Sequence, residues 1–239
     1  MRVPMIAALA FLFIPAFSAA ETDIPQPKMR SMDRPDIRIG RTFDPSTSGT
    51  INPSPRVPKP RIISKKEWGG SESTGTIRAH FPVRLTLHHV GTARPLTPED
   101  DPTEKLKGIQ IWGWTDKGWP DLPYHFLIDL DGNIYEGRDV MKVGDTNTKY
   151  DPAGHFLVSV IGNYDLQAPN EKQLAAIADL MAWGSDYFNI DPSTIASHRD
   201  YVPSTLCPGR YLYPYVYSGF LQGEVRRRLA EAYKPQDSN

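Results

Sequence analysis

The sequence predicts a single α/β domain in which helices flank a mixed central β-sheet. Segments with strand character alternate with segments of helical periodicity between residues 61 and 233, an order typical of this class. The dipeptide Asp131-Gly132 indicates a tight hairpin, which adds an antiparallel pair to the sheet. The nearly continuous apolar run at residues 156–162 is typical of a central strand buried on both faces.

The N-terminus predicts a signal peptide at residues 1–20. A positive start, an apolar run at residues 6–14 and the small residues Ser18-Ala19-Ala20 indicate cleavage before Glu21. The alternative is a retained membrane anchor, but the apolar run is shorter than the roughly 20 residues that a spanning helix needs. We therefore expect an exported protein, periplasmic or secreted, with no membrane span after cleavage.

Residues 21–60 are rich in proline and predict a linker or N-terminal extension. Such a segment buries too little apolar surface to offset its ordering entropy, which favours extended or disordered chain. The alternatives are a strap across the domain or an arm that reaches a partner. The net charge of −1, with Lys and Arg spread along the chain, gives no support for nucleic-acid binding.

The predicted elements follow in order through the domain at residues 61–233. A short helix is expected after Ser64, with Glu67 completing a capping box. A long helix is expected after Asn170, with Gln173 in the same capping position. Strands are expected at residues 83–90, 124–128, 134–136, 140–143, 156–162 and 194–196, further helices at 102–115 and 217–233, and a flexible tail at 234–239.

The only cysteine of the chain, Cys207, cannot form an intramolecular disulfide. His198 precedes it across a polar loop, and a thiolate with an imidazole is a natural pair of zinc ligands. The alternative is a buried free cysteine and a surface histidine. A third ligand must come from elsewhere, and the pair His88-His89 lies in a predicted strand. Successive strand side chains point to opposite faces, so periodicity leaves open which histidine is the ligand.

The ordered set of motifs resembles the zinc-dependent N-acetylmuramoyl-L-alanine amidase family, which includes the peptidoglycan recognition proteins and the phage T7 lysozyme type. The resemblance covers roughly residues 61–215, and the order of the motifs carries it more than any single one. The matching pieces are Ile62 to Gly69, Leu87-His88-His89, Ile109-Gln110, residues 118–128, residues 131–138, Ile161 to Tyr164, and His198-Arg199-Asp200 through Cys207-Pro208-Gly209.

This resemblance implies a zinc ion held by His88, His198 and Cys207, with Tyr124 as a catalytic residue and Thr205 in a second catalytic position. Two imidazoles and a thiolate leave a fourth position open, which is the pattern of a catalytic zinc. The implied reaction is hydrolysis of the amide between N-acetylmuramic acid and L-alanine, with peptidoglycan or a muropeptide as partner. The sequence departs from the family where its usual Gly-x-His reads Gly144-Asp145-Thr146.

Two other functions are compatible with the same fold. One is a module that binds peptidoglycan without cutting it, and the other is a zinc hydrolase that cuts a different amide bond. The presence of both histidines and the cysteine favours the enzyme. Two further contacts with substrate are expected: Trp112 or Trp114 lines a sugar-binding groove, and Arg138 pairs with a substrate carboxylate. We expect His89 to pack in the core or to support the metal ligands rather than to bind the metal itself.

Overall fold

The computed structural model describes residues 49–235 of the chain. The predicted signal peptide, residues 21–48 of the extension and residues 236–239 of the tail lie outside this range. Among the described residues, none of the helices combines the length and the apolar character needed to cross a membrane.

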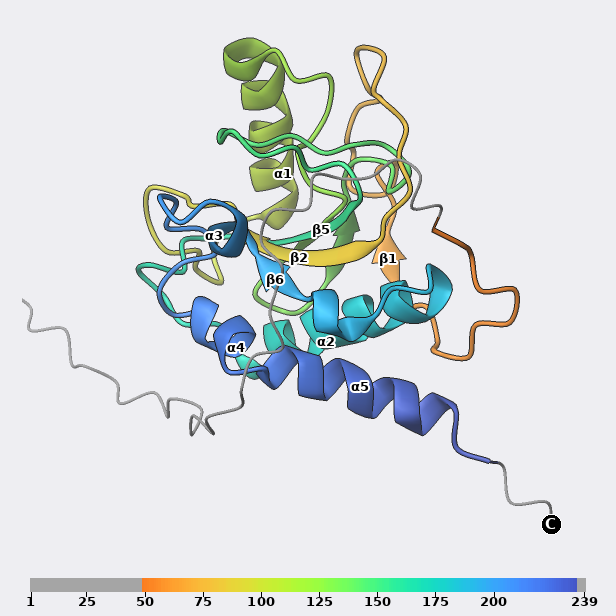
Figure 1. The fold of residues 1–239 in the computed structure, drawn as a ribbon. Coiled ribbons are helices and arrows are strands. Elements are labelled where there is room, and N and C mark those ends of the chain that lie inside the picture. Colours follow the sequence, from red (N-terminus) through yellow and green to blue (C-terminus); the bar gives the residue numbers. More distant parts are fainter. Residues whose placement is uncertain (1–48, 236–239) are drawn as a thin grey trace, which may run out of the picture.

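A mixed six-stranded sheet forms the centre of the described domain, in the order β1-β4-β3-β5-β2-β6 (Figure 1). Only the β3–β4 hairpin is antiparallel among these neighbours, and the other pairs are parallel. The predicted fold class is therefore confirmed. The strands are β1 (Ile62–Ile63), β2 (Arg84–His89), β3 (Phe126–Ile128), β4 (Ile134–Glu136), β5 (His155–Val160) and β6 (Ala196–Ser197).

Helices cover both faces of the sheet. In Figure 1, α2 (Glu171–Tyr187) and α5 (Phe220–Ala232) lie below the sheet, whereas α1 (Pro102–Trp112) lies above it. The α2 helix begins with the expected capping box. The Asn170 side chain accepts from the Gln173 N–H, and the Gln173 side chain accepts from the Asn170 N–H.

The core is divided between the two faces. On β2, Leu85 and Leu87 are fully buried in the larger cluster, together with residues of α2 and α5. On the other face, Leu106 of α1 packs in a smaller cluster with Leu127 of β3. Because side chains alternate along a strand, the burial of Leu85 and Leu87 against α2 turns His88 toward the face that carries α1.

Several predicted element boundaries are wrong. Residues 65–69 form consecutive turns rather than a helix, although the Ser64 N–H and hydroxyl donate to the Glu67 carboxylate as expected. Gly69, at φ 76°, ends this segment before a helix can propagate. In place of a strand at 140–143, Lys142 makes one isolated bridge to Ala79.

The helix ends also differ from the prediction. The helix predicted at residues 102–115 ends as an α-helix at Trp112, and a π-helical turn, Gly113–Lys117, follows it. The C-terminal helix is divided into α4 (Tyr213–Tyr217) and α5, because Gly219 adopts φ 77° between them. A short helix, α3 (His198–Tyr201), occupies the start of the segment predicted as a loop.

Residues 49–60, the described part of the extension, lie against the domain as a strap, which is one of the arrangements considered above. Val57 is buried in the larger core cluster. The backbone N–H groups of Arg56 and Val57 donate to the Asp186 carboxylate at 2.6 and 2.7 Å. The strap therefore joins the same face of the sheet as α2 and α5.

Candidate metal centre and cleft

Three ligand-type side chains converge at the carboxyl ends of neighbouring strands. His88 lies near the end of β2, His198 follows β6 directly, and Cys207 returns after a loop. Their ligand atoms all lie within 4.8 Å of one another. Since β2 and β6 are parallel neighbours, their carboxyl ends meet at one edge of the sheet, where α/β proteins commonly place a site.

The spacing of these atoms fits a tetrahedral zinc. The His88 Nδ1 atom lies 3.6 Å from the Cys207 Sγ atom. Zinc bonds of about 2.3 Å to sulfur and about 2.1 Å to nitrogen, at a tetrahedral angle, place two such ligand atoms about 3.6 Å apart. The His88 and His198 rings are 4.9 Å apart between centroids and tilted by 48°, so they are close neighbours without stacking.

Burial keeps the two imidazoles neutral. His88 is almost fully buried, and desolvation holds its pKa well below the ordinary histidine value. Desolvation lowers the pKa of His198 to about 4. Burial also raises the pKa of the Cys207 thiol to about 12, which means that a thiolate here needs a compensating cation. Neutral imidazoles and a thiolate that a metal stabilises are the forms that bind zinc.

The turn that carries His198 and Cys207 is fixed by a buried carboxylate. Asp200 accepts hydrogen bonds of 2.8 Å from both the N–H and the hydroxyl of Ser197, and Tyr213 Oη donates to it at 3.0 Å. The Arg199 N–H donates to the carbonyl of Cys207 at 3.0 Å and closes the loop. These contacts place the second and third ligand-type side chains relative to each other.

The cluster lies in a cleft of about 950 Å³. The α1 side contributes Ile109 and Trp112, with Trp119 edge-on to Trp112 at 5.3 Å. The opposite side contributes Thr205 and the exposed side chain of Leu206. This volume lies in the range of small-molecule sites, and its mixed aromatic and polar lining suits an amphipathic ligand.

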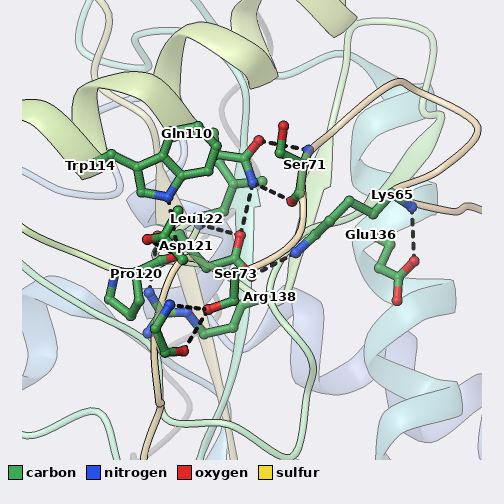
Figure 2. A network of polar contacts seen from close by, with 12 residues as sticks. Lys65, Ser71, Ser73, Gln110, Trp114, Pro120, Asp121, Leu122, Glu136 and Arg138 are labelled. Atoms are coloured by element: carbon green, nitrogen blue, oxygen red, sulfur yellow. Dashed lines mark hydrogen bonds and ion pairs between the residues drawn. The ribbon is translucent and has the colours of Figure 1, made fainter.

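Of the two tryptophans predicted for a groove, only Trp112 lines this cleft among its described residues. Trp114 is turned away, and its indole N–H donates to the Pro120 carbonyl at 3.1 Å (Figure 2). The predicted role of Arg138 is also wrong. Its guanidinium is buried, pairs with Asp145 and donates to the carbonyls of Val143 and Asp121. Arg138 therefore holds Asp145, which lines the cleft.

Tyr124 and Thr205, the two predicted catalytic residues, both line the cleft. The Tyr124 ring lies 5.2 Å from the His88 ring, and its Oη donates a long hydrogen bond of 3.4 Å to the His89 carbonyl. Burial raises the pKa of Tyr124, so its phenol remains a proton donor. Thr205 Oγ1 accepts from the Cys207 N–H at 3.3 Å and therefore lies directly beside the cluster.

The other four histidines form hydrogen bonds with backbone groups or a hydroxyl of the protein. His89 Nδ1 accepts from the Tyr164 N–H at 3.1 Å, in agreement with a packing role. His125 and His80 each use both ring nitrogens on backbone groups. His155 Nδ1 lies 2.8 Å from the hydroxyl of Thr86.

Two residues beside the cluster were not predicted from the sequence. Thr148 Oγ1 lies 2.7 Å from the His198 Nε2 atom, and Tyr150 Oη lies 3.4 Å from the His88 Nε2 atom. Both belong to an irregular segment with no periodicity of its own. The one sequence signal nearby was the departure at Gly144-Asp145-Thr146.

Comparison with known proteins identifies the family. The model of the Amidase_2 family, N-acetylmuramoyl-L-alanine amidase, matches residues 79–210, more than half of the chain. The chain belongs to this family of type 2 amidases and peptidoglycan recognition proteins. It is 34% identical to peptidoglycan-recognition protein SC2 of Drosophila simulans over 151 residues, which are 62% of this chain and 80% of the relative. It is 30% identical to peptidoglycan recognition protein 1 of Rattus norvegicus, with 66% and 86% covered.

Solved structures show the same fold. Drosophila PGRP-LB superposes with a TM-score of 0.59 at 27% identity, covering 66% of this chain and 93% of that one. The endolysin N-acetylmuramoyl-L-alanine amidase LysCS from Clostridium intestinale superposes with a TM-score of 0.55 at 24% identity, covering 69% and 96%. The second likeness concerns the fold alone.

Proposed function

We propose that this protein is an exported zinc-dependent amidase that hydrolyses the bond between N-acetylmuramic acid and the L-alanine of the stem peptide. The observation that carries the proposal is the convergence of His88, His198 and Cys207 in the cleft. Relatives named for peptidoglycan recognition support the substrate class. One structural relative, at 28% identity and a TM-score of 0.57, is the ectodomain complex of peptidoglycan recognition proteins LCa and LCx with tracheal cytotoxin bound.

The zinc fits its proposed ligands by donor chemistry and by spacing. When bound, zinc polarises a carbonyl group and lowers the pKa of water from about 16 toward about 7. The chain supplies the remaining functions. Tyr124 donates a hydrogen bond to the amide oxygen as charge develops there, and such a donor contributes about 3 kcal/mol. The Thr205 hydroxyl, beside Cys207, supports the same oxygen or orients the water.

Recognition without cleavage is the second candidate, because several relatives are named for recognition rather than for an activity. The cleft offers the volume and the aromatic Trp112 side that binding alone requires. A third candidate is hydrolysis of a different amide, since the residues that surround a zinc site set its specificity.

Mass spectrometry of a purified disaccharide-tetrapeptide, incubated with the zinc-loaded mature protein, separates these candidates. Release of a free peptide that begins with L-alanine, together with an intact disaccharide, is the expected result. An unchanged muropeptide that co-purifies with the protein would favour the binding module. Cleavage of an ordinary peptide, with the muropeptide left intact, would favour the third candidate.

Export is proposed on the N-terminal signal alone. Expression of the full chain in a bacterial host, followed by fractionation and N-terminal sequencing, should yield mature protein that begins at Glu21 outside the cytoplasm. Retention of residues 1–20 in a membrane fraction would favour the anchor instead.

A further inference from the structure

The irregular segment 144–150 lies against the Nε2 atoms of both histidines of the cluster. His88 directs Nδ1 toward Cys207 Sγ at 3.6 Å and Nε2 toward Tyr150 Oη at 3.4 Å. His198 directs Nε2 toward Thr148 Oγ1 at 2.7 Å, with Thr146 Oγ1 at 3.3 Å. One segment therefore faces both imidazoles from outside the cluster.

The chemistry of a metal-bound imidazole decides the direction of these contacts. A neutral imidazole that gives one nitrogen lone pair to a metal carries its proton on the other nitrogen. That N–H needs an oxygen acceptor, and a hydroxyl oxygen serves. With Nε2 of His198 against Thr148 and Nε2 of His88 against Tyr150, Nδ1 is the nitrogen left for the metal in both rings.

The neighbouring Thr146 hydroxyl allows Thr148 to take this acceptor role. The Thr148 hydroxyl can donate its hydrogen to Thr146 Oγ1, which lies 2.9 Å away. Thr146 Oγ1 also accepts from the Thr148 N–H at 3.2 Å. With its hydrogen directed to Thr146, the Thr148 oxygen presents a lone pair to His198.

The segment is fixed on both sides. At its start, Asp145 pairs with the buried guanidinium of Arg138, whose Nη2 also donates to the Asp121 carbonyl in the network of Figure 2. Gly144 has no room for a side chain, because a Cβ there would lie 2.6 Å from the Pro123 carbonyl oxygen. At its end, the ring of Tyr150 stacks on that of Tyr201 at 5.5 Å and 11°.

We propose that Thr148 and Tyr150 are positioning residues that select the Nδ1-binding tautomer of His198 and His88 and hold both rings for the metal. Thr148 makes the larger contribution, because its contact is 2.7 Å against 3.4 Å for Tyr150. The inference rests on the proposed zinc site and assigns the departure from Gly-x-His a role, since this chain supplies hydroxyls to the outer side of the ligands.

The test is zinc affinity, measured on the mature protein by competition with a chromophoric chelator. Thr148→Val keeps the shape and removes the acceptor, and we expect zinc affinity to fall about 10–100-fold. Thr148→Ser should retain affinity within a few-fold, because the hydroxyl remains. Tyr150→Phe should weaken binding by less than about tenfold. Thr74→Val is the matched control, since Thr74 is exposed and its hydroxyl donates to the Pro120 carbonyl, away from the cluster.

Cobalt(II) substitution gives a second readout, because its visible absorption reports ligand geometry. Thr148→Val should alter the spectrum, whereas Thr74→Val should not. Thermal unfolding of the metal-free variants checks that the fold is intact. Zinc affinity and spectra equal to wild type in Thr148→Val would overturn the inference. Wild-type protein that does not bind zinc would overturn both this inference and the proposed metal site. Normal zinc behaviour without muropeptide cleavage would remove only the proposed enzyme activity.

Discussion

Two buried polar centres lie on opposite faces of the sheet and differ in what surrounds them. In the cleft, two imidazoles and a thiol bring their electron-pair donors within 4.8 Å of one another. On the face covered by α2 and α5, the Asp186 carboxylate is surrounded by hydrogen-bond donors, from Asn52, Arg56, Val57 and Tyr233, at 2.6 to 2.8 Å.

The difference separates a candidate site from a structural joint. Asp186 is complemented by the chain itself, so it links the strap, the end of α2 and the C-terminal helix. The cleft cluster gathers groups of the same chemical kind, and a cation is the natural complement of such a set. Removing a member of each centre should therefore have different consequences.

Replacing Cys207 by Ala should have the largest effect on function. The variant loses the thiolate ligand, so bound zinc and muropeptide cleavage should fall together to background while the fold persists. Metal analysis, muropeptide cleavage and circular dichroism measure the three quantities. Full activity in a zinc-free variant would refute the metal hypothesis.

Replacing Asp186 by Ala should have the reverse profile. It leaves the buried N–H of Val57 and the part-buried N–H of Arg56 without an acceptor. An unsatisfied buried group costs about 1–3 kcal/mol and a part-buried one costs less, so the free energy of unfolding should fall by about 3 kcal/mol. Zinc affinity should be unchanged. Asp179→Ala, on the same helix and with 53% of its side chain exposed, is the control and should cost less than about 1 kcal/mol. Equal destabilisation by the two changes would contradict a joint at Asp186.

Replacing Tyr124 by Phe should separate chemistry from metal binding within the cleft. The variant keeps the ring beside His88 and loses the hydroxyl, so turnover should fall roughly a hundredfold, equivalent to about 3 kcal/mol, at unchanged zinc content. Single-turnover kinetics on a muropeptide measures the change. Unaltered turnover would exclude Tyr124 from the mechanism.

The smallest expected effect, counted for one side chain, concerns the histidines whose ring nitrogens bind backbone groups. Burial lowers the pKa of His125 to about 3 and lowers that of His80, so the unfolded chain binds more protons than the folded one below pH about 6.5. Stability contributed by these groups is full above pH 6.5 and is lost as pH falls toward 3, at up to about 1.4 kcal/mol per pH unit for each group.

Urea unfolding of the metal-free protein at pH 7, 6 and 5 measures the summed loss from all the buried histidines, including His88 and His198, and comparison with His125→Gln isolates the share of His125. His125→Gln should reduce the slope, because one titrating group is removed. A free energy of unfolding that does not change between pH 7 and pH 5 would contradict the assignment.

Sequence periodicity predicted most of the central elements but placed their ends less well. The strand at β2 and the capping box of α2 follow from side-chain alternation and from Asn170 and Gln173, which act over a few residues. The turns after Ser64 and the break at Gly219 coincide with glycines at positive φ, but a glycine in the sequence does not reveal whether it ends a helix or lies within one.

The order of the motifs in the sequence identified the family, and the residue types of His198 and Cys207 indicated a pair of zinc ligands. Side-chain alternation did not determine which histidine of the pair faces the cleft, because it assigns the two residues to opposite faces of the strand without showing which face lines the cleft. Tertiary packing decided this by burying Leu85 and Leu87 against the α2 side, which turned His88 toward Cys207. The contacts of Thr148 with His198, and of Asp186 with the strap, likewise join residues far apart in the chain. Such pairs leave no local pattern, since their geometry exists only after the sheet and its loops have assembled.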